Sequence, residues 1–176
     1  MDPADLRHLR RCVELAGAGL EAGDEPFGSV LVDADGTVLF EDHNHVAGGD
    51  ETRHPEFEIA KWSATHMTPA ARAAATVYTS GEHCPMCAAA HGWVGLGRIV
   101  YVSSSAQLTE WRAEMGLAPG PGAPAADPGS GAGRRGGRAG TGAGRANARA
   151  ASPARVEGRV GIRRRPPCLP GARAAE

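Results

Sequence analysis

The amino-acid composition changes near residue 116, and this change limits which part of the chain can form a folded domain. Of the last 60 residues, 47 are Gly, Ala, Pro or Arg, and none is aromatic. Such a segment holds too little apolar side chain to offset the entropy lost on ordering. We therefore expect one folded domain over residues 1–116 and a disordered tail over residues 117–176. The four dominant residue types of the tail share GC-rich codons, so a shifted reading frame is one hypothesis for its origin.

Charge divides the chain at the same place. The net charge of the whole sequence is −1, yet residues 1–116 contain 8 basic and 17 acidic residues, while the tail contains 11 arginines and three acidic residues. Proteins that bind nucleic acid neutralise phosphates with Lys and Arg. We therefore do not expect the folded domain to bind nucleic acid.

The compartment is predicted from what the sequence lacks. No apolar run approaches the roughly 18 residues that a membrane-spanning helix needs, and the start, MDPADLRHLRRC, has no apolar signal-peptide core. We expect a cytoplasmic protein without membrane contact. In that setting Cys84 and Cys87, spaced as CxxC, indicate a metal or redox pair, and Cys12 and Cys168 are interpreted as bystanders.

Helix and strand patterns alternate along the first 116 residues. Apolar residues recurring at intervals of three and four predict a helix over residues 6–20. Short apolar runs and helix-starting prolines predict strands at 28–32, 37–40, 75–79 and 98–102, and helices at 55–67, 85–94 and 106–115. This order predicts an α/β fold in which a mixed sheet has helices on both faces and the first two strands are antiparallel.

Two short motifs carry the chemistry, and each opens a predicted helix. They are His54-Pro55-Glu56 and Cys84-Pro85-Met86-Cys87. Thiolates at a helix N-terminus meet the positive end of the helix dipole, which lowers their pKa and prepares them to bind a cation. One imidazole and two thiolates leave a tetrahedral position open for water, as in catalytic rather than structural zinc sites. Glu56 is placed to lie beside that open position.

These motifs resemble the H-x-E and P-C-x-x-C signature of the cytidine deaminase-like superfamily, and most closely its guanine deaminase and tRNA adenosine deaminase-like members. The resemblance covers residues 6–116. It implies a three-layer α/β/α fold and a Zn²⁺ ion held by His54, Cys84, Cys87 and a water. It also implies that Glu56 moves the protons in a hydrolytic deamination that releases ammonia.

Further positions match the family, and two depart from it. Asn44 resembles the asparagine that hydrogen-bonds the base, Phe27 resembles a residue lining the pocket, and Glu82 stands where relatives have Glu before Pro-Cys. His83 replaces the usual proline, and Pro55 replaces a small residue whose N–H can face a substrate carbonyl. Proline has no N–H. The substrate of any one relative therefore does not transfer directly to this chain.

Three functions remain open from the sequence. The first is a zinc-dependent deaminase of a small nucleobase or nucleoside, of guanine, cytosine or aminotriazine type. The second is a tRNA-specific adenosine deaminase. The third is a catalytically weak zinc-fold protein whose Arg-rich tail binds nucleic acid, although that tail has no aromatic residue to stack bases. The acidic folded part favours the first function.

Several residues also have less specific interpretations. A structural zinc knuckle or a redox pair would explain CxxC alone, but a redox pair explains neither His54 nor Glu56. We interpret His43 and His45, which flank Asn44, as solvated or pocket-rim residues rather than ligands. The resemblance further implies a homodimer formed through the helices after CxxC, with Trp93 and Trp111 supplying apolar area.

Overall fold

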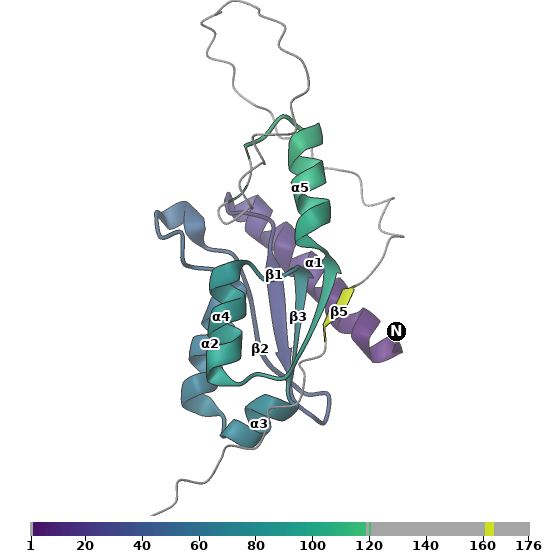
Figure 1. Ribbon diagram of the computed structural model, residues 1–176, viewed down its shortest axis with the longest axis vertical. Helices are drawn as coiled ribbons and strands as arrows, with labels where there is room; N and C mark the ends of the chain where they lie inside the picture. Colours follow the sequence, from purple (N-terminus) through teal and green to yellow (C-terminus); the bar gives the residue numbers. More distant parts are fainter. Residues whose placement is uncertain (1, 119, 121–160, 164–176) are drawn as a thin grey trace, which may run out of the picture.

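The computed structural model describes residues 2–118, residue 120 and residues 161–163. One five-stranded sheet, in the order β2-β1-β3-β4-β5, forms the centre (Figure 1). In chain order the elements are α1 (Pro3–Ala22), β1 (Gly28–Val32), β2 (Val38–His43), η1 (Val46–Gly48), α2 (Pro55–His66), α3 (Pro69–Ala74), β3 (Thr76–Gly81), α4 (Pro85–Val94), β4 (Arg98–Ser103), α5 (Ser105–Glu114) and β5 (Gly161–Arg163).

The sheet is mixed, as the sequence predicts. Strand β1 pairs antiparallel with both β2 and β3, whereas β3 and β4 run parallel and are connected through α4. A parallel pair requires such a crossover because its strands start at the same edge. Both β3 and β4 therefore end at the same edge of the sheet, and α4 begins directly beyond the end of β3.

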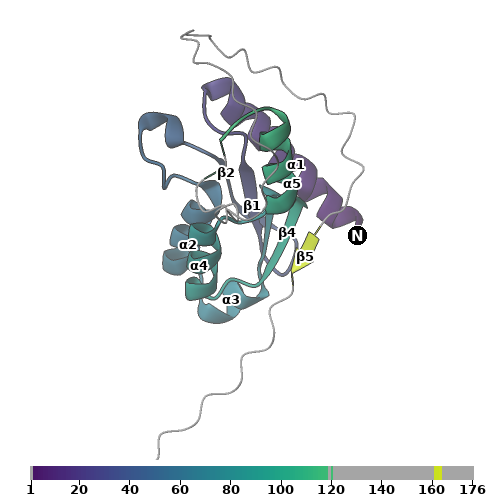
Figure 2. The same ribbon diagram turned by 45° about the horizontal axis from the view of Figure 1, so that its top comes forward.

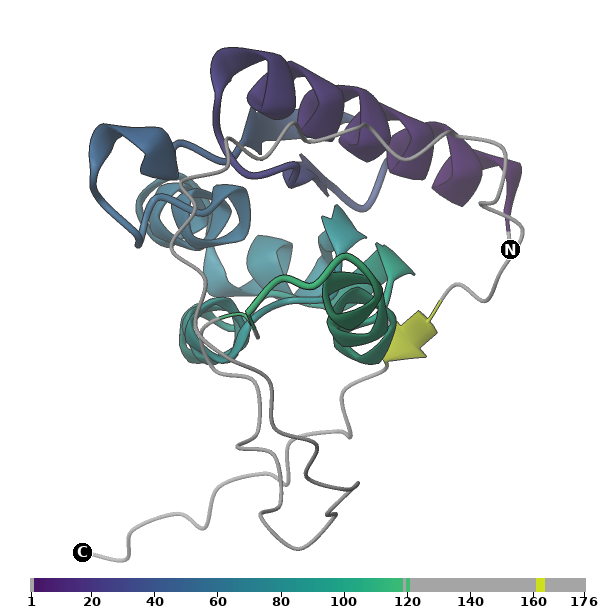
Figure 3. The same ribbon diagram turned by 90° about the horizontal axis from the view of Figure 1, so that it is seen from above.

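Helices cover both faces of the sheet (Figure 3), which confirms the predicted three-layer α/β fold. Helix α1 packs on one face, where Leu9 and Cys12 contact Val30. On the other face Ile59 of α2 packs against Leu31, and α4 lies beside α2 (Figure 2). Every residue of β1 is buried, because a strand covered on both faces has no solvent side.

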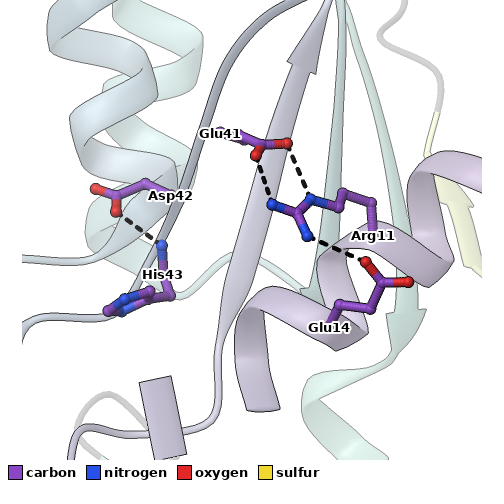
Figure 4. Close-up of polar contacts among 5 residues, drawn as sticks. All are labelled: Arg11, Glu14, Glu41, Asp42 and His43. Atoms are coloured by element: carbon purple, nitrogen blue, oxygen red, sulfur yellow. Dashed lines mark hydrogen bonds and ion pairs between the residues drawn. The ribbon is translucent and has the colours of Figure 1, made fainter. Parts of the chain in front are cut away.

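Polar contacts fix α1 across its face of the sheet. The buried carboxylate of Asp5 accepts hydrogen bonds from Arg98 Nη2 at 2.8 Å and from the Tyr78 hydroxyl at 2.8 Å. Near the middle of α1, Arg11 donates to Glu41 of β2 at 2.6 Å and to Glu14 at 3.1 Å (Figure 4). The buried Asp5 bond network ties α1 to β3 and β4 more strongly than the exposed Arg11 bridges do, since water screens exposed ion pairs.

The structure corrects the sequence predictions at two places. Helix α3 was not predicted because it has only six residues; it starts where the Thr68 hydroxyl accepts the Ala71 N–H. Strand β5 contradicts the expectation that nothing in the tail is ordered, since Gly161–Arg163 pairs antiparallel with β4. Edge pairing uses backbone groups alone, so side-chain composition did not reveal it. The disorder predicted for the remaining tail falls outside the described residues.

The last described helices leave apolar side chains in solvent. Trp93 of α4 is 93% exposed and Trp111 of α5 is 45% exposed, so neither belongs to the core. Trp62 of α2 is half-buried and packs against Phe40. Among residues 2–118, no helix combines the length and apolar character needed to cross a membrane. The cytoplasmic location stays a prediction.

Candidate active site

The two predicted motifs meet because each one starts a helix, and the two helices pack together. His54 is the N-cap residue of α2, and Cys84 is the N-cap residue of α4. Each is followed by a proline at the first helical position, where a missing N–H costs nothing. The Cys84 sulfur also accepts the backbone N–H of Cys87 at 3.5 Å. The start of each helix therefore determines where its ligands lie.

Three ligand atoms converge between these helix starts. Nδ1 of His54 lies 3.7 Å from Sγ of Cys84 and 3.6 Å from Sγ of Cys87, and the three ligand atoms all lie within 4.8 Å of one another. Tetrahedral zinc, with bonds of roughly 2.3 Å to sulfur and 2.0 Å to nitrogen, separates such ligands by roughly 3.5 Å. The donor set and its spacing therefore fit a zinc ion.

The two thiols differ in acidity. The pKa of Cys84 falls to about 4, first because the Cys87 thiol donates to its sulfur and then because His54 and the Cys87 backbone N–H stabilise the thiolate. The same contact with Cys84, together with burial, raises the pKa of Cys87. The hydrogen bond with Cys84 raises the pKa of His54. Without a metal, Cys84 is therefore the thiol that ionises first.

Glu56, in the first turn of α2, is only 5% exposed and has its two carboxylate oxygens in different surroundings. Oε1 accepts hydrogen bonds from the Ser29 hydroxyl at 2.9 Å and the Thr79 hydroxyl at 2.6 Å. Oε2 lies 3.8 Å from Sγ of Cys87. One oxygen is thus held by the sheet, and the other contacts the Cys87 thiol of the candidate metal site.

Sequence reasoning missed the two hydroxyls that hold Glu56. Ser29 of β1 and Thr79 of β3 are fully buried and stand directly opposite each other in the antiparallel pair. Opposite residues point to the same face of a sheet, so both hydroxyls reach one carboxylate oxygen. The available signal was Ser29, the one polar side chain in the otherwise apolar and fully buried strand β1.

Asn44, which follows β2, is fully buried with its amide oriented by the backbone. The backbone N–H of Asn44 donates to the Phe27 carbonyl at 3.0 Å, and the side-chain Oδ1 accepts the Val46 N–H at 2.9 Å. Within the part of the chain that the structure describes, its side-chain Nδ2 has no hydrogen-bond partner. A buried donor left unpaired is costly, so this nitrogen is the kind of group that a ligand satisfies.

The other two predicted substrate contacts lie differently. The Phe27 ring packs against the end of β3, where a Cβ added at Gly81 would stand 3.0 Å from its Cε1. Glu82 turns toward α5, and its Oε2 accepts the Ser105 N–H at 3.0 Å. A hollow of about 420 Å³, lined in part by Glu82 and His83, lies between α4, β4 and α5. None of the three ligand residues lines this hollow.

The two departures from the family pattern are both in the interior. The Pro55 side chain is fully buried at the start of α2. The His83 ring is 8% exposed, meets the His91 ring edge-on at 5.3 Å, and has no hydrogen-bond partner for either nitrogen among the described residues. Burial lowers the pKa of His83, which favours the neutral ring.

A three-layer α/β/α fold with one His and two Cys at adjacent helix starts defines a zinc-binding domain of the deaminase class. Residues 3–103 match the family model of the cytidine and deoxycytidylate deaminase zinc-binding region, and the chain belongs to this family. The matched range includes Glu56 and the three candidate ligands His54, Cys84 and Cys87. Membership makes zinc the cofactor of this domain and makes the protein a deaminase-family enzyme.

Individual relatives fall into several deaminase types. The chain is 30% identical to a probable cytosine deaminase of Schizosaccharomyces pombe, over 65% of this chain and 70% of that protein. It is 33% identical to guanine deaminase of Bacillus subtilis, over 58% and 66%. The chain thus spans about two thirds of the length of these relatives.

Similar solved structures also come from deaminases of more than one type. The guanine deaminase of Bacillus subtilis superposes with a TM-score of 0.53 at 30% identity, over 68% of this chain and 73% of that one. A structure from work on A-to-I editing by tRNA:A34 deaminases superposes with a TM-score of 0.50 at 26% identity, over 56% and 76%. These likenesses support a nucleobase or nucleoside deaminase family and leave the substrate open.

Proposed function

We propose that this protein is a zinc-dependent hydrolytic deaminase of a small nucleobase or nucleoside, with Glu56 as its proton carrier. The observation that carries the proposal is the position of Glu56. Ser29 and Thr79 hold Oε1 from the sheet, while Oε2 contacts the Cys87 thiol of the proposed metal site. A group that only complemented the dipole of α2 would need neither the burial nor the two hydroxyl donors.

The chemistry follows from that arrangement. When bound by His54, Cys84 and Cys87, the zinc ion supplies Lewis-acid activation of the attacking water. Glu56 Oε2 accepts a proton from that water and delivers it to a ring nitrogen of the substrate. The water oxygen bonds to the ring carbon as the ring C=N double bond becomes single, which gives a tetrahedral intermediate. Glu56 then takes the second proton from the new hydroxyl and passes it to the amino nitrogen, so that the bond from the ring carbon to this nitrogen breaks. Ammonia leaves, and the ring carbon becomes a carbonyl.

Substrate binding is proposed for Asn44 and Phe27. The unpaired, buried Nδ2 of Asn44 would donate to an acceptor on the base, because its Oδ1 is already bound to the backbone. The Phe27 ring would form part of an apolar wall near the end of β3. Glu82 would act through the start of α5 rather than by direct contact. Pro55 cannot offer an N–H, so the substrate must place no carbonyl there or bind it otherwise.

Charge supports a small substrate over tRNA. Residues 1–116 hold 17 acidic and only 8 basic side chains, which opposes the binding of a polyanion. The similarity to a tRNA:A34 deaminase structure keeps tRNA adenosine as the second candidate. The two candidates are separated by which substrates release ammonia.

The test combines a substrate panel with matched glutamate variants. Free bases, nucleosides, aminotriazines and tRNA are each incubated with the full chain, and ammonia release and zinc content are measured on the same sample. Glu56→Gln should keep zinc but lose turnover by roughly 10²–10⁴-fold. Glu58→Gln is the control, because Glu58 lies in the same helical turn but binds Lys61 at the surface. Turnover retained by Glu56→Gln would remove Glu56 from the mechanism.

We also infer a homodimer formed through α4 and α5. Trp93 is 93% exposed on α4, and Trp111, Met115 and Leu117 are exposed on or just beyond α5. Large apolar side chains are enriched in subunit interfaces. Light scattering should give a dimer mass at micromolar concentration, and Trp93→Lys should lower it. A monomeric wild-type protein would contradict this inference.

A further inference from the structure

A second group of metal-binding side chains lies outside the His54, Cys84 and Cys87 cluster. Asp24 follows the end of α1, His43 ends β2, and His45 precedes η1. One ligand atom from each of these three residues lies within 4.8 Å of the others. The two imidazole rings are 4.3 Å apart between centroids, and all three side chains are half-buried.

The hydrogen bonds of the two histidines fix which nitrogen each can offer. Nδ1 of His43 contacts the carbonyl oxygen of Asn44 at 2.8 Å, and Nε2 of His45 contacts Oδ1 of Asp42 at 2.8 Å. Because both partners are acceptors, each of these nitrogens carries the proton. In the neutral form of each ring, the lone pair is therefore on Nε2 of His43 and on Nδ1 of His45. Metal-binding histidines are oriented in this way, with one nitrogen bound to an oxygen and the other left for the ion.

Hydrogen bonds from the backbone hold Asp24 of this group and the neighbouring Asp42 in place. Oδ1 of Asp24 accepts the Ala47 N–H at 2.7 Å, which orients its carboxylate. Oδ1 of Asp42 also accepts the backbone N–H of His43 at 2.8 Å (Figure 4). Asp42 therefore orients the segment that carries both histidines without occupying a ligand position itself.

We propose that Asp24, His43 and His45 form a second binding site for a divalent first-row transition metal such as Zn²⁺. Two neutral imidazoles and one carboxylate are a ligand set that such ions use with open positions left for water. The carboxylate offsets part of the ion's charge. Half-exposed side chains give the ion a path from solvent. The site revises the sequence-based interpretation of His43 and His45 as rim residues.

The second site would tie together three segments beside the candidate active site. Asn44 stands between the two histidines, and the His45 N–H donates to the carbonyl oxygen of Arg53 at 3.0 Å, one residue before His54. Asp24 follows the end of α1 and is far in the sequence from His43 and His45, which lie two residues apart. An ion bound here would hold the loop of Asn44 against α1. This predicts stabilisation by zinc beyond the first equivalent.

The experiment measures zinc stoichiometry on the full chain and does not depend on turnover. Protein carrying one equivalent of zinc is equilibrated with a buffered series of free Zn²⁺, and bound zinc is determined by mass spectrometry of the metal. Asp24→Asn and His45→Gln each remove one ligand. His66→Gln is the control, because His66 is an exposed histidine on α2 outside the group.

Wild type and His66→Gln should bind two equivalents, and Asp24→Asn and His45→Gln should bind one. Added zinc should likewise raise the melting temperature of wild type and His66→Gln only, since an ion that binds the folded state stabilises it. A single equivalent in wild type overturns the proposal, even if a variant fails to fold. A second equivalent that persists in both ligand variants, or that His66→Gln also loses, overturns it as well.

Discussion

The two metal-binding groups are built in different ways. His54, Cys84 and Cys87 belong to the starts of two packed helices, and a buried carboxylate held by two hydroxyls lies beside them. The proposed second site lies on a loop and two element ends, with half-exposed ligands and no comparable buried acid within the described residues. We propose that the first arrangement binds an ion and moves a proton next to it, whereas the second only binds an ion. Burial of Glu56 next to the ligands, rather than metal binding alone, separates the two.

The sharpest test of that distinction is removal of one ligand from the first group. His54→Ala should lose the tightly bound zinc and all measurable ammonia release, because two thiolates alone do not complete the site. The weaker equivalent assigned to Asp24, His43 and His45 should remain. Zinc content and turnover are measured together. Loss of both equivalents in a folded variant would mean that the two groups are not independent.

Thiol reactivity of the metal-free protein gives the next largest effect. With the pKa of Cys84 lowered to about 4 and that of Cys87 raised, Cys84 should be a thiolate at pH 6 while Cys87 stays protonated. Iodoacetamide at pH 6 should therefore label Cys84 far faster than Cys87, as read from peptide masses. Bound zinc should protect both. Equal labelling of the two would contradict the assigned charge distribution.

The same lowered pKa gives a pH dependence with a defined sign. A thiol whose folded pKa lies below its unfolded value of 9.0 stabilises the folded state fully above pH 9, and that contribution disappears as the pH falls toward 4. Labelling of Cys84 should accordingly decline only as the pH approaches 4. A decline centred near pH 9 would show that the neighbours of Cys84 do not stabilise its thiolate.

A smaller effect is expected from the hydroxyls that hold Glu56. Thr79→Val keeps the shape of the side chain but removes the 2.6 Å bond to Oε1. Loss of a hydrogen bond to a buried charge costs about 1–3 kcal/mol, so we expect kcat to fall by roughly 10- to 100-fold with zinc retained. Thr65→Val, at an exposed position of α2, is the control. Unchanged kcat in Thr79→Val would show that Ser29 alone positions the carboxylate.

The smallest effect is expected from the tail. Cutting the chain after Pro119 removes β5, whose three residues pair with the edge of β4 at Ile99–Tyr101 and contribute no ligand to either group. We expect zinc content to be unchanged and the free energy of unfolding to fall by about 1 kcal/mol or less, as expected when only a few edge hydrogen bonds are lost. Thermal unfolding and metal analysis check this. Unfolding or metal loss on truncation would make the tail part of the domain.

The sequence by itself predicted the residues of the first metal group, because each half of the group is local to one helix start, whereas the packing of α2 against α4 brings the two halves together. Pro55 and Pro85 mark the first turns, and the spacings of His54 to Glu56 and Cys84 to Cys87 place the groups within one helical turn. The strand and helix order followed from periodic patterns that burial on two faces imposes. These features depend on neighbours a few residues apart, and such neighbours are visible in a sequence.

Only the tertiary structure decided the rest, because the partners are distant in the chain. Ser29 and Thr79 reach one oxygen of Glu56 through strand register, and no local pattern specifies that register. Asp24 joins His43 because α1 packs back across the sheet that β2 belongs to. Strand β5 pairs through backbone atoms that every residue carries. Contacts of this kind depend on how the elements pack, and packing is a property of the whole domain.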